Sequence, residues 1–340
     1  MSTPIPRTRR TLLAAAGALL GLSMLSACGG AATGNEGAVK SDGSVDLSKV
    51  TLIVGDQKGG SKALLQAAGE LDDLPYEVQW QEFTSGPPLL EALNAGSIHI
   101  GGVGNTPPLF AAAAKGTFQA VQAATYGGTG DAIVVPKDSP IKSVSDLKGK
   151  TVGVAEGSSA NYNLLAQLDK AGLKYSDVSV QNLQPADALA AFSSGHLDAW
   201  AIWEPFTSQA EKEAGARVIT TGKGLVNGYV FQIASQAALD DPATTAALKD
   251  YVGRIAKAQV WSSTHKEEWA KVWSEETGLS EDITLAATKK RDVSLVPITQ
   301  EVIDSEQGMA DAFSENGLLP GKIDVSPFFS DAFNDDTTGK

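Results

Sequence analysis

The sequence contains one cysteine and three histidines among its 340 residues. A single cysteine excludes a disulfide framework and any zinc site built on cysteine thiolates. The histidines are His99, His196 and His265, and their spacing matches no metal-binding motif. We therefore expect neither a bound metal ion nor a cofactor.

Basic side chains are also scarce. The chain has 27 lysines and arginines against 40 aspartates and glutamates, a formal net charge of −13. Phosphate contacts need clusters of lysine and arginine, so this balance argues against a nucleic-acid partner. No serine, histidine and aspartate form a plausible catalytic set, and the glycine-containing loop Gly153–Ser158 lacks the Gly-Lys-Ser/Thr ending of a phosphate-binding loop. We expect a protein that is not an enzyme.

The N-terminus has the features of an export signal. Arg7, Arg9 and Arg10 precede an apolar run that is too short and too rich in glycine to span a bilayer. The run ends in Leu25-Ser26-Ala27-Cys28, which resembles the lipobox of bacterial lipoproteins, in which the cysteine is lipidated. A plain signal peptide with a chance cysteine is the alternative. Since Arg9 and Arg10 also resemble a twin-arginine signal, export through the general or the twin-arginine pathway stays open.

These features predict a lipoprotein signal peptide over residues 1–28, lipidation of Cys28, and a flexible tether over residues 29–48. The folded part is then expected outside the cytoplasm, anchored by lipid to the outer face of the cell membrane or held in the periplasm.

The folded part repeats one plan. Buried-strand patterns at residues 50–55 and 150–155 are each followed by a glycine-containing loop, a helical pattern and a short strand, at 78–80 and 178–180. Strands alternating with helices indicate parallel α/β units, and the length suggests about two domains at about 150 residues each. We therefore predict two α/β lobes that face each other.

The predicted boundaries follow from these patterns and are listed here: lobe 1 over residues 49–131, lobe 2 over 132–231, a mostly helical return to lobe 1 over 232–334, and a frayed tail over 335–340. The apolar stretches Asp131–Val135 and Tyr229–Ala234 are the predicted hinge strands between the lobes. In the return segment, helices are predicted over Ala243–Trp261, Lys266–Glu276, Ser280–Lys290 and Thr299–Glu315.

Ligands of parallel α/β sheets bind at the carboxyl ends of the strands, where helix N-termini offer unpaired N–H groups. Four loops in such positions, with one tyrosine at the edge of the first lobe, supply the candidate ligand-binding residues: Gln57, Lys58, Asn105, Thr106, Tyr126, Gly157, Ser158, Ser159, Trp203 and Glu204. Each loop taken alone also fits an ordinary turn, Lys58 a surface lysine, and Tyr126 a packing residue. Helix N-termini on both walls of a cleft would suit a sulfonate or another tetrahedral oxyanion.

Several strings resemble the aliphatic-sulfonate substrate-binding proteins of ABC importers. They are Glu82–Pro87, Leu90–Ile98, Pro136–Ser143, Asp146–Lys150, Pro185–Ala188 and Asp198–Pro205. The similarity covers about residues 50–330 in order. It implies a type II periplasmic-binding-protein fold, in which two α/β lobes joined by two hinge strands close over a ligand cleft. It also implies docking on a membrane permease driven by a cytoplasmic ATPase.

By this resemblance, the ten candidate residues are expected to contact the ligand. The expected ligand is an alkyl- or arylsulfonate, which is captured for sulfur acquisition. The protein is expected to act as a monomer. Two positions depart from the family: Asn105 stands where sulfonate-type members often have an acid, and Tyr229 where taurine-type members have one. A sulfonate without a cationic end is therefore the preferred ligand. The alternatives are another small anion or aromatic acid (taurine, nitrate, a pyrimidine) or an enzyme on the same fold.

Overall fold

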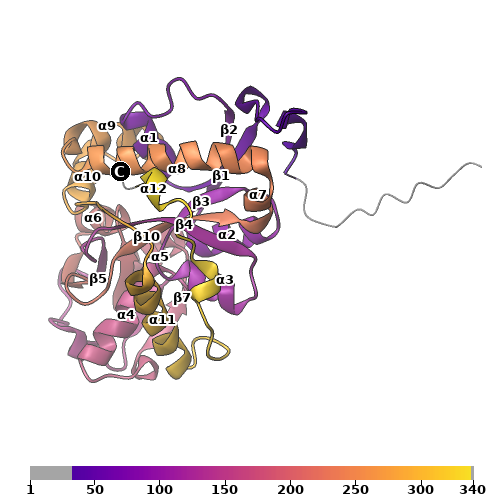
Figure 1. Ribbon diagram of the computed structural model, residues 1–340. Coiled ribbons are helices and arrows are strands. Elements are labelled where there is room, and N and C mark those ends of the chain that lie inside the picture. Colours follow the sequence, from indigo (N-terminus) through magenta and orange to yellow (C-terminus); the bar gives the residue numbers. More distant parts are fainter. Residues whose placement is uncertain (1–32, 338–340) are drawn as a thin grey trace, which may run out of the picture. The chain divides into compact units, whose positions relative to one another are not determined.

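The computed structural model describes residues 33–337 and contains two β-sheets with helices around them (Figure 1). The first sheet has the strand order β11-β4-β10-β3-β1-β2, and the second has the order β7-β6-β8-β5-β9. The strands of the first sheet are β1 (Thr51–Gln57), β2 (Glu77–Phe83), β3 (Ile100–Gly104), β4 (Phe118–Thr125), β10 (Tyr229–Ser235) and β11 (Ser294–Val296). Those of the second are β5 (Asp131–Val135), β6 (Thr151–Val154), β7 (Ser179–Asn182), β8 (Ala199–Trp203) and β9 (Arg217–Thr221).

The predicted repeat is confirmed. β1 pairs in parallel with β2 and β3, and its counterpart β6 pairs in parallel with β7 and β8. Each parallel core is extended by antiparallel strands, β10 beside β3 and β5 beside β8, so both sheets are mixed. The carboxyl ends of the parallel strands define the edge of each sheet where a ligand site is expected.

Helices follow the strands as predicted. In the two halves they are α1 (Ser61–Ala67), α2 (Gly86–Asn94), α3 (Pro107–Ala113), α4 (Ser159–Lys170), α5 (Pro185–Ser193) and α6 (Phe206–Glu213). The return segment forms α7 (Gln236–Asp240), α8 (Pro242–Ser262), α9 (Lys266–Thr277), α10 (Glu281–Thr288) and α11 (Gln300–Glu315), which confirms its four predicted helices. No helix in residues 33–337 has the length and apolar character needed to cross a membrane.

The predicted hinge strands do not cross between the sheets, which corrects that assignment. Asp131–Val135 forms β5, which pairs only within the second sheet, and Tyr229–Ala234 belongs to β10 in the first sheet. The chain passes from one sheet to the other in the segments just before them, residues 126–130 and 222–228. The apolar character of the two strands reflects their central place in a sheet, where both faces are covered.

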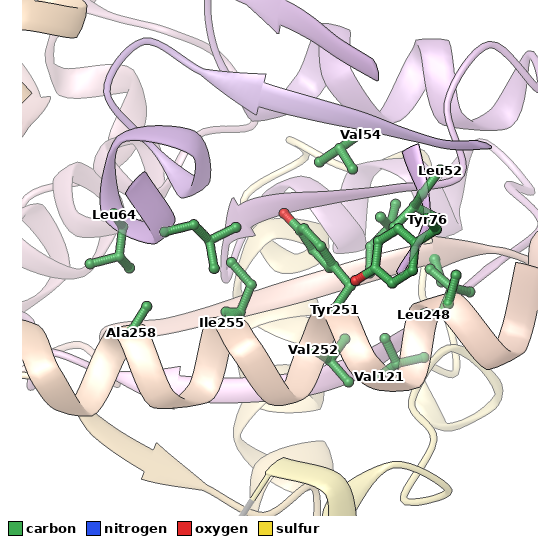
Figure 2. Close-up of a cluster of buried hydrophobic side chains, with 14 of the residues drawn as sticks. Leu52, Val54, Leu64, Tyr76, Val121, Leu248, Tyr251, Val252, Ile255 and Ala258 are labelled. Atoms are coloured by element: carbon green, nitrogen blue, oxygen red, sulfur yellow. The ribbon is translucent and has the colours of Figure 1, made fainter. Parts of the chain in front are cut away.

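One hydrophobic cluster of the first lobe lies between β1 and the long helix α8, which is orange in Figure 1. Figure 2 shows Tyr251 and Ile255 of α8 on the side of the helix that faces Leu52 and Val54 of β1. These side chains are at most 1% exposed. Burial of each contributes about 1.5–3 kcal/mol. The return segment therefore completes the core of the first lobe, which explains why the chain comes back to it.

The ends of the described chain are more ordered than the sequence predicts. Asn35, within the predicted tether, is buried, and its side chain bonds the backbone of Thr51 and the hydroxyl of Thr244. Ala38 packs into the core of the first lobe. At the other end, residues 335–337 of the predicted frayed tail belong to α12 (Asn334–Thr337), and the last three residues lie outside the described part of the chain. The predicted signal peptide and Cys28 lie outside the described residues.

A buried polar network ties one crossing segment to the first lobe. Asn227, within residues 222–228, accepts a hydrogen bond from Asn105 Nδ2 at 2.7 Å and donates to Glu306 Oε1 at 2.8 Å. Glu306 on α11 is fully buried, and its Oε2 has no partner among the described residues. Burial raises the pKa of Glu306 to about 8, although the hydrogen bond from Asn227 opposes the shift. The carboxyl group is therefore protonated at neutral pH.

The Glu306→Gln variant tests this assignment. In the folded state the carboxyl keeps its proton up to about pH 8, whereas its ordinary pKa is 4.5. Between these values the folded state binds more protons, so the free energy of unfolding falls as the pH rises. Glutamine mimics the protonated acid and removes this dependence. We expect the Tm of the wild-type protein, measured by circular dichroism, to fall relative to that of the variant between about pH 5 and about pH 8.5. A constant difference in Tm would contradict a protonated Glu306.

Candidate functional site

A cleft lies between the strand ends of the two sheets. From the first lobe it is lined by the loop after β1 and by the end of β3, and from the second lobe by the start of α4 and the end of β8. The helices α8 and α9 of the return segment add one further wall. The cleft therefore lies at the carboxyl ends of the parallel strands of both lobes, as the sequence predicts.

Seven of the ten predicted site residues line the cleft: Gln57, Lys58, Tyr126, Ser158, Ser159, Trp203 and Glu204. Trp200, predicted to be core, is fully buried against Phe192, whereas Trp203 reaches the cleft. Which of the seven residues contact a ligand stays a prediction.

The other three residues, Asn105, Thr106 and Gly157, do not line the cleft. Asn105 and Thr106 are buried, and Thr106 Oγ1 donates to Asn105 Oδ1 at 3.0 Å. Asn105 in turn belongs to the network of Asn227, so its side chain is used inside the first lobe. A direct ligand contact predicted for these two side chains therefore does not fit the structure.

The two serine hydroxyls are engaged within the second lobe. Ser158 Oγ donates to Ala155 O at 2.6 Å and accepts a bond from Asn161 N, which makes it the N-cap of α4. Ser159 Oγ donates to Asp131 Oδ1 at 2.7 Å. Both hydroxyl protons thus have acceptors in the protein, and these serines do not present free donors to an anion in this conformation.

Arg291 is the main cationic group on the cleft wall, and the sequence reasoning missed it. Its guanidinium carbon lies 4.5 Å from the ring centre of Tyr126 and 5.4 and 5.7 Å from those of Trp273 and Trp269. Arg291 Nη2 donates to the Tyr126 hydroxyl at 2.9 Å. Burial raises the pKa of Tyr126 while the charge of Arg291 lowers it, and the net shift is upward, so the phenol stays neutral. The run Lys289-Lys290-Arg291 in an acidic chain was the available signal.

Three N–H groups lack acceptors, one in this guanidinium and two in the indoles beside it. Arg291 Nε and the indole nitrogens of Trp269 and Trp273 are buried with no hydrogen-bond partner among residues 33–337. The two indoles stack at 5.2 Å because they are four residues apart on α9. A Cβ on Gly59, which lines the cleft, would lie 1.5 Å from Trp273 Nε1, so this nitrogen sits against the loop after β1. Unpaired donors between aromatic rings suit an anion with an organic part.

Three carboxylates also line the cleft. Burial raises the pKa of Asp56 to about 6, although the backbone N–H groups of Lys62 and Ser61 lower it. Burial likewise raises the pKa of Asp131 to about 6, while Ser159 and Arg291 lower it. The third carboxylate, Glu204, is 1% exposed. No group of three histidine, cysteine, aspartate or glutamate side chains in residues 33–337 is arranged to hold a metal ion.

Several known proteins are similar to this chain in sequence and in fold. Residues 77–239 match the family model described as NMT1/THI5 like. The alkanesulfonate-binding protein SsuA from Xanthomonas axonopodis pv. citri, solved with MOPS bound, is 33% identical, with a TM-score of 0.76 over 82% of this chain and 98% of that one. The periplasmic aliphatic sulphonate binding protein SsuA from Escherichia coli is 34% identical, with a TM-score of 0.73 over 82% of this chain and 91% of that one. The chain belongs to the aliphatic sulfonate-binding protein family.

This membership confirms the predicted two-lobed periplasmic-binding-protein fold. The same fold also occurs in the desulfurization enzyme DSZB, which is 16% identical with a TM-score of 0.61 over 85% of this chain and 99% of that one. That likeness shows the fold alone. The close relatives of this family member are binding proteins.

An ion pair joins the lobes of this sulfonate-binding family member beside Arg291. Lys290 Nζ lies 2.8 Å from Glu204 Oε1 and 2.8 Å from Glu211 Oε2, both in the second lobe. Glu204 also accepts a bond from Ser208 N at 3.1 Å. Burial lowers the pKa of Lys290, but the charges and hydrogen bonds of Glu204 and Glu211 more than offset this and raise it. The loop after α10 is thus tied to the second lobe.

Replacement of Lys290 by methionine tests this ion pair. The variant leaves Glu204 buried without its counter-charge, and we expect the free energy of unfolding in urea to fall by about 2 kcal/mol. Adding Glu204→Gln should recover part of the loss, because the buried charge is then removed. Lys289→Met, an exposed neighbour, is the matched control and should change stability by less than about 0.5 kcal/mol. Equal effects of the two methionine variants would show that Lys290 does not compensate the buried charge of Glu204.

Proposed function

We propose that this protein captures an organosulfonate in the cleft and delivers it to an ABC permease for sulfur acquisition. The three buried N–H groups without acceptors around Arg291 carry this proposal. A sulfonate offers three oxygens to such donors. Charge-assisted hydrogen bonds of this kind contribute about 1.5–3 kcal/mol each. Three of them are enough for micromolar affinity, about −8 kcal/mol.

The organic part of the ligand is assigned to the aromatic walls. Trp203 packs edge-on against Phe206 at 5.9 Å, and both line the cleft opposite the tryptophans of α9. Aromatic faces bury alkyl or aryl groups without requiring a polar partner. The site residues that we assign to the ligand are Arg291, Trp269, Trp273, Tyr126, Gln57, Lys58 and Trp203.

We assign no bond chemistry to the cleft. The serine hydroxyls donate within the second lobe, and the N–H groups left for an anion are those of Arg291, Trp269 and Trp273. Capture is followed by docking on the permease and its ATPase, with the protein acting as a monomer outside the cytoplasm. A lipid anchor at Cys28 would keep it next to the permease.

Ligand capture by lobe closure accounts for the tight contact between the lobes at β3. A Cβ on Gly104, at the end of β3, would lie 3.2 Å from Ser159 Cβ. Such a contact is tighter than most Cβ contacts, so even an alanine here would push Ser159 back by a few tenths of an ångström, and a larger side chain would push it further. Closure then adds contacts from the second lobe to those of the first, which favours the bound state.

The Arg291→Met variant tests the assigned anion site. We expect isothermal titration with alkanesulfonates of two to eight carbons and with benzenesulfonate to give at least a thirtyfold higher Kd, because a buried charge-assisted contact is lost. Lys289→Met removes one exposed positive charge from the same loop and should leave the Kd within about twofold. Sulfate, nitrate and benzoate complete the panel. If one of these three binds tightly and no sulfonate binds, the substrate is not a sulfonate. If the protein converts a sulfonate into another compound, it is an enzyme.

The Gly104→Leu variant tests closure. The added side chain has no room against Ser159, so we expect the variant to stay open, to bind the same sulfonate at least tenfold more weakly, and to retain its fold by circular dichroism. Small-angle scattering should show a larger radius of gyration than that of the wild-type complex. Unchanged affinity and radius would contradict closure at this contact. The control is Gly308→Leu, because Gly308 lies on α11 with open space around it. Gly127→Leu is unsuitable, because the positive φ of Gly127 would strain any side chain there.

A further inference from the structure

Three buried glutamines lie where the cleft meets the core of the first lobe. Gln122 of β4 and Gln232 of β10 are opposite each other in the sheet, and Gln259 of α8 contacts Gln122. They are 1%, 4% and 6% exposed, respectively. Gln232 and Gln259 also line the cleft. A buried amide is costly unless its N–H2 group and its oxygen find hydrogen-bond partners, so the partners of these three side chains are informative.

The hydrogen bonds of Gln122 fix the orientation of the Gln259 amide. Gln122 Nε2 donates to Ala123 O at 3.1 Å and to Gln259 Oε1 at 2.8 Å. Gln259 Oε1 is therefore used inside the protein, whereas Gln259 Nε2 makes no hydrogen bond within residues 33–337. Because Gln259 lines the cleft, its N–H2 group is a donor that a ligand can reach.

Gln232 offers an acceptor. Its Oε1 is buried and has no hydrogen-bond partner among the described residues, and its Nε2 has only the Ser61 hydroxyl, at 3.5 Å. Gly102 is opposite Gln232 on β3, and a Cβ there would lie 2.9 Å from Gln232 Nε2. The neighbouring strand thus brings no side chain to the amide, and no group of the protein supplies the missing donor.

We propose that Gln232 and Gln259 form a specificity subsite for a hydroxyl group on the organic part of a sulfonate. This inference rests on the proposed function and adds the second end of the ligand. A hydroxyl group is both a donor and an acceptor, so it can donate to Gln232 Oε1 and accept from Gln259 Nε2. A methyl group in its place satisfies neither atom and leaves a buried acceptor without a partner.

The subsite lies close to the donors that we assign to the sulfonate. Gln259 and Ser263 are four residues apart on α8 and therefore neighbours on one face of the helix end. Ser263 Oγ donates to Val293 O at 3.1 Å and accepts from Val293 N at 3.2 Å. Val293 follows Arg291 by two residues, and both line the cleft. A short carbon chain is therefore expected to connect the hydroxyl subsite with the anion site.

Matched ligand pairs test this inference without any variant. 2-Hydroxyethanesulfonate and propanesulfonate have the same number of heavy atoms and differ only in a hydroxyl group for a methyl group. The same holds for 3-hydroxypropanesulfonate and butanesulfonate, and for 4-hydroxybutanesulfonate and pentanesulfonate. By titration calorimetry we expect the hydroxyl compound to bind at least tenfold more tightly in the pair of best-fitting length, because the methyl compound leaves buried polar groups unpaired.

The Gln232→Met variant assigns the preference to its residue, since methionine has a similar length and lacks the amide. Its hydroxyl preference should fall to within about threefold, while its Kd for the methyl-ended sulfonates should stay the same or decrease. Gln79→Met, at an exposed position on β2, is the matched control and should keep the wild-type preference. Circular dichroism checks that each variant is folded.

Gln259→Met is a second variant that removes the donor of the subsite and leaves Gln122 its backbone acceptor. It should lower the hydroxyl preference as well, and it carries the test if Gln232→Met does not fold. Sulfonate binding with no hydroxyl preference in any pair, or a preference that survives in the folded variants, overturns this inference alone. Failure of every sulfonate to bind overturns the proposed function and this inference with it.

Discussion

The contact of Lys290 with the buried carboxylate of Glu204 sets the geometry on which the cleft depends. Lys290 ends the α10 region of the first lobe and reaches the second lobe, so the next residue, Arg291, is held at the mouth between them. In a chain with a net charge of −13, two consecutive basic residues thus have different roles. Lys290 neutralises an acid of the protein, and Arg291 keeps donors free. A buried pair of this kind costs desolvation and gains little net stability, and its value here is the position it gives to its neighbour.

The polar atoms of the cleft are the second organising feature. Folded proteins leave few buried polar groups without partners, so unpaired groups gathered in one place point to a ligand. In the cleft these groups include the N–H donors of Arg291, Trp269 and Trp273. The acids that the fold uses for capping or for joining the lobes are satisfied internally, as Asp56 shows with its two backbone bonds.

The sequence placed a site residue correctly at the cleft where the prediction depended only on its immediate neighbours in the chain. Gln57 and Trp203 end β1 and β8, and Lys58 follows β1 directly. A residue at the carboxyl end of a parallel strand reaches the edge of the sheet where ligands bind, so the sequence was enough to place these three at the cleft. Thr106 also begins a helix after a strand, but its hydroxyl bonds Asn105, and that choice depends on Asn227, far away in the chain. Arg291 has no strand or helix-start signal of its own. Its place follows from the packing of α9 and α10 against both lobes, which no short pattern contains.

The sequence by itself determined the two α/β halves, their common order, the helices of the return segment and the family, because these follow from hydrophobic periodicity and local motifs. It also indicated that the cleft lies at the strand ends. Only the tertiary structure decided that β5 and β10 each belong to one sheet, that Asn35 and Ala38 pack on the first lobe, and that Arg291 lines the cleft. These outcomes depend on contacts between residues far apart in the chain. Such contacts depend on which buried polar groups find hydrogen-bond partners in the folded chain. Composition and residue spacing do not contain this information.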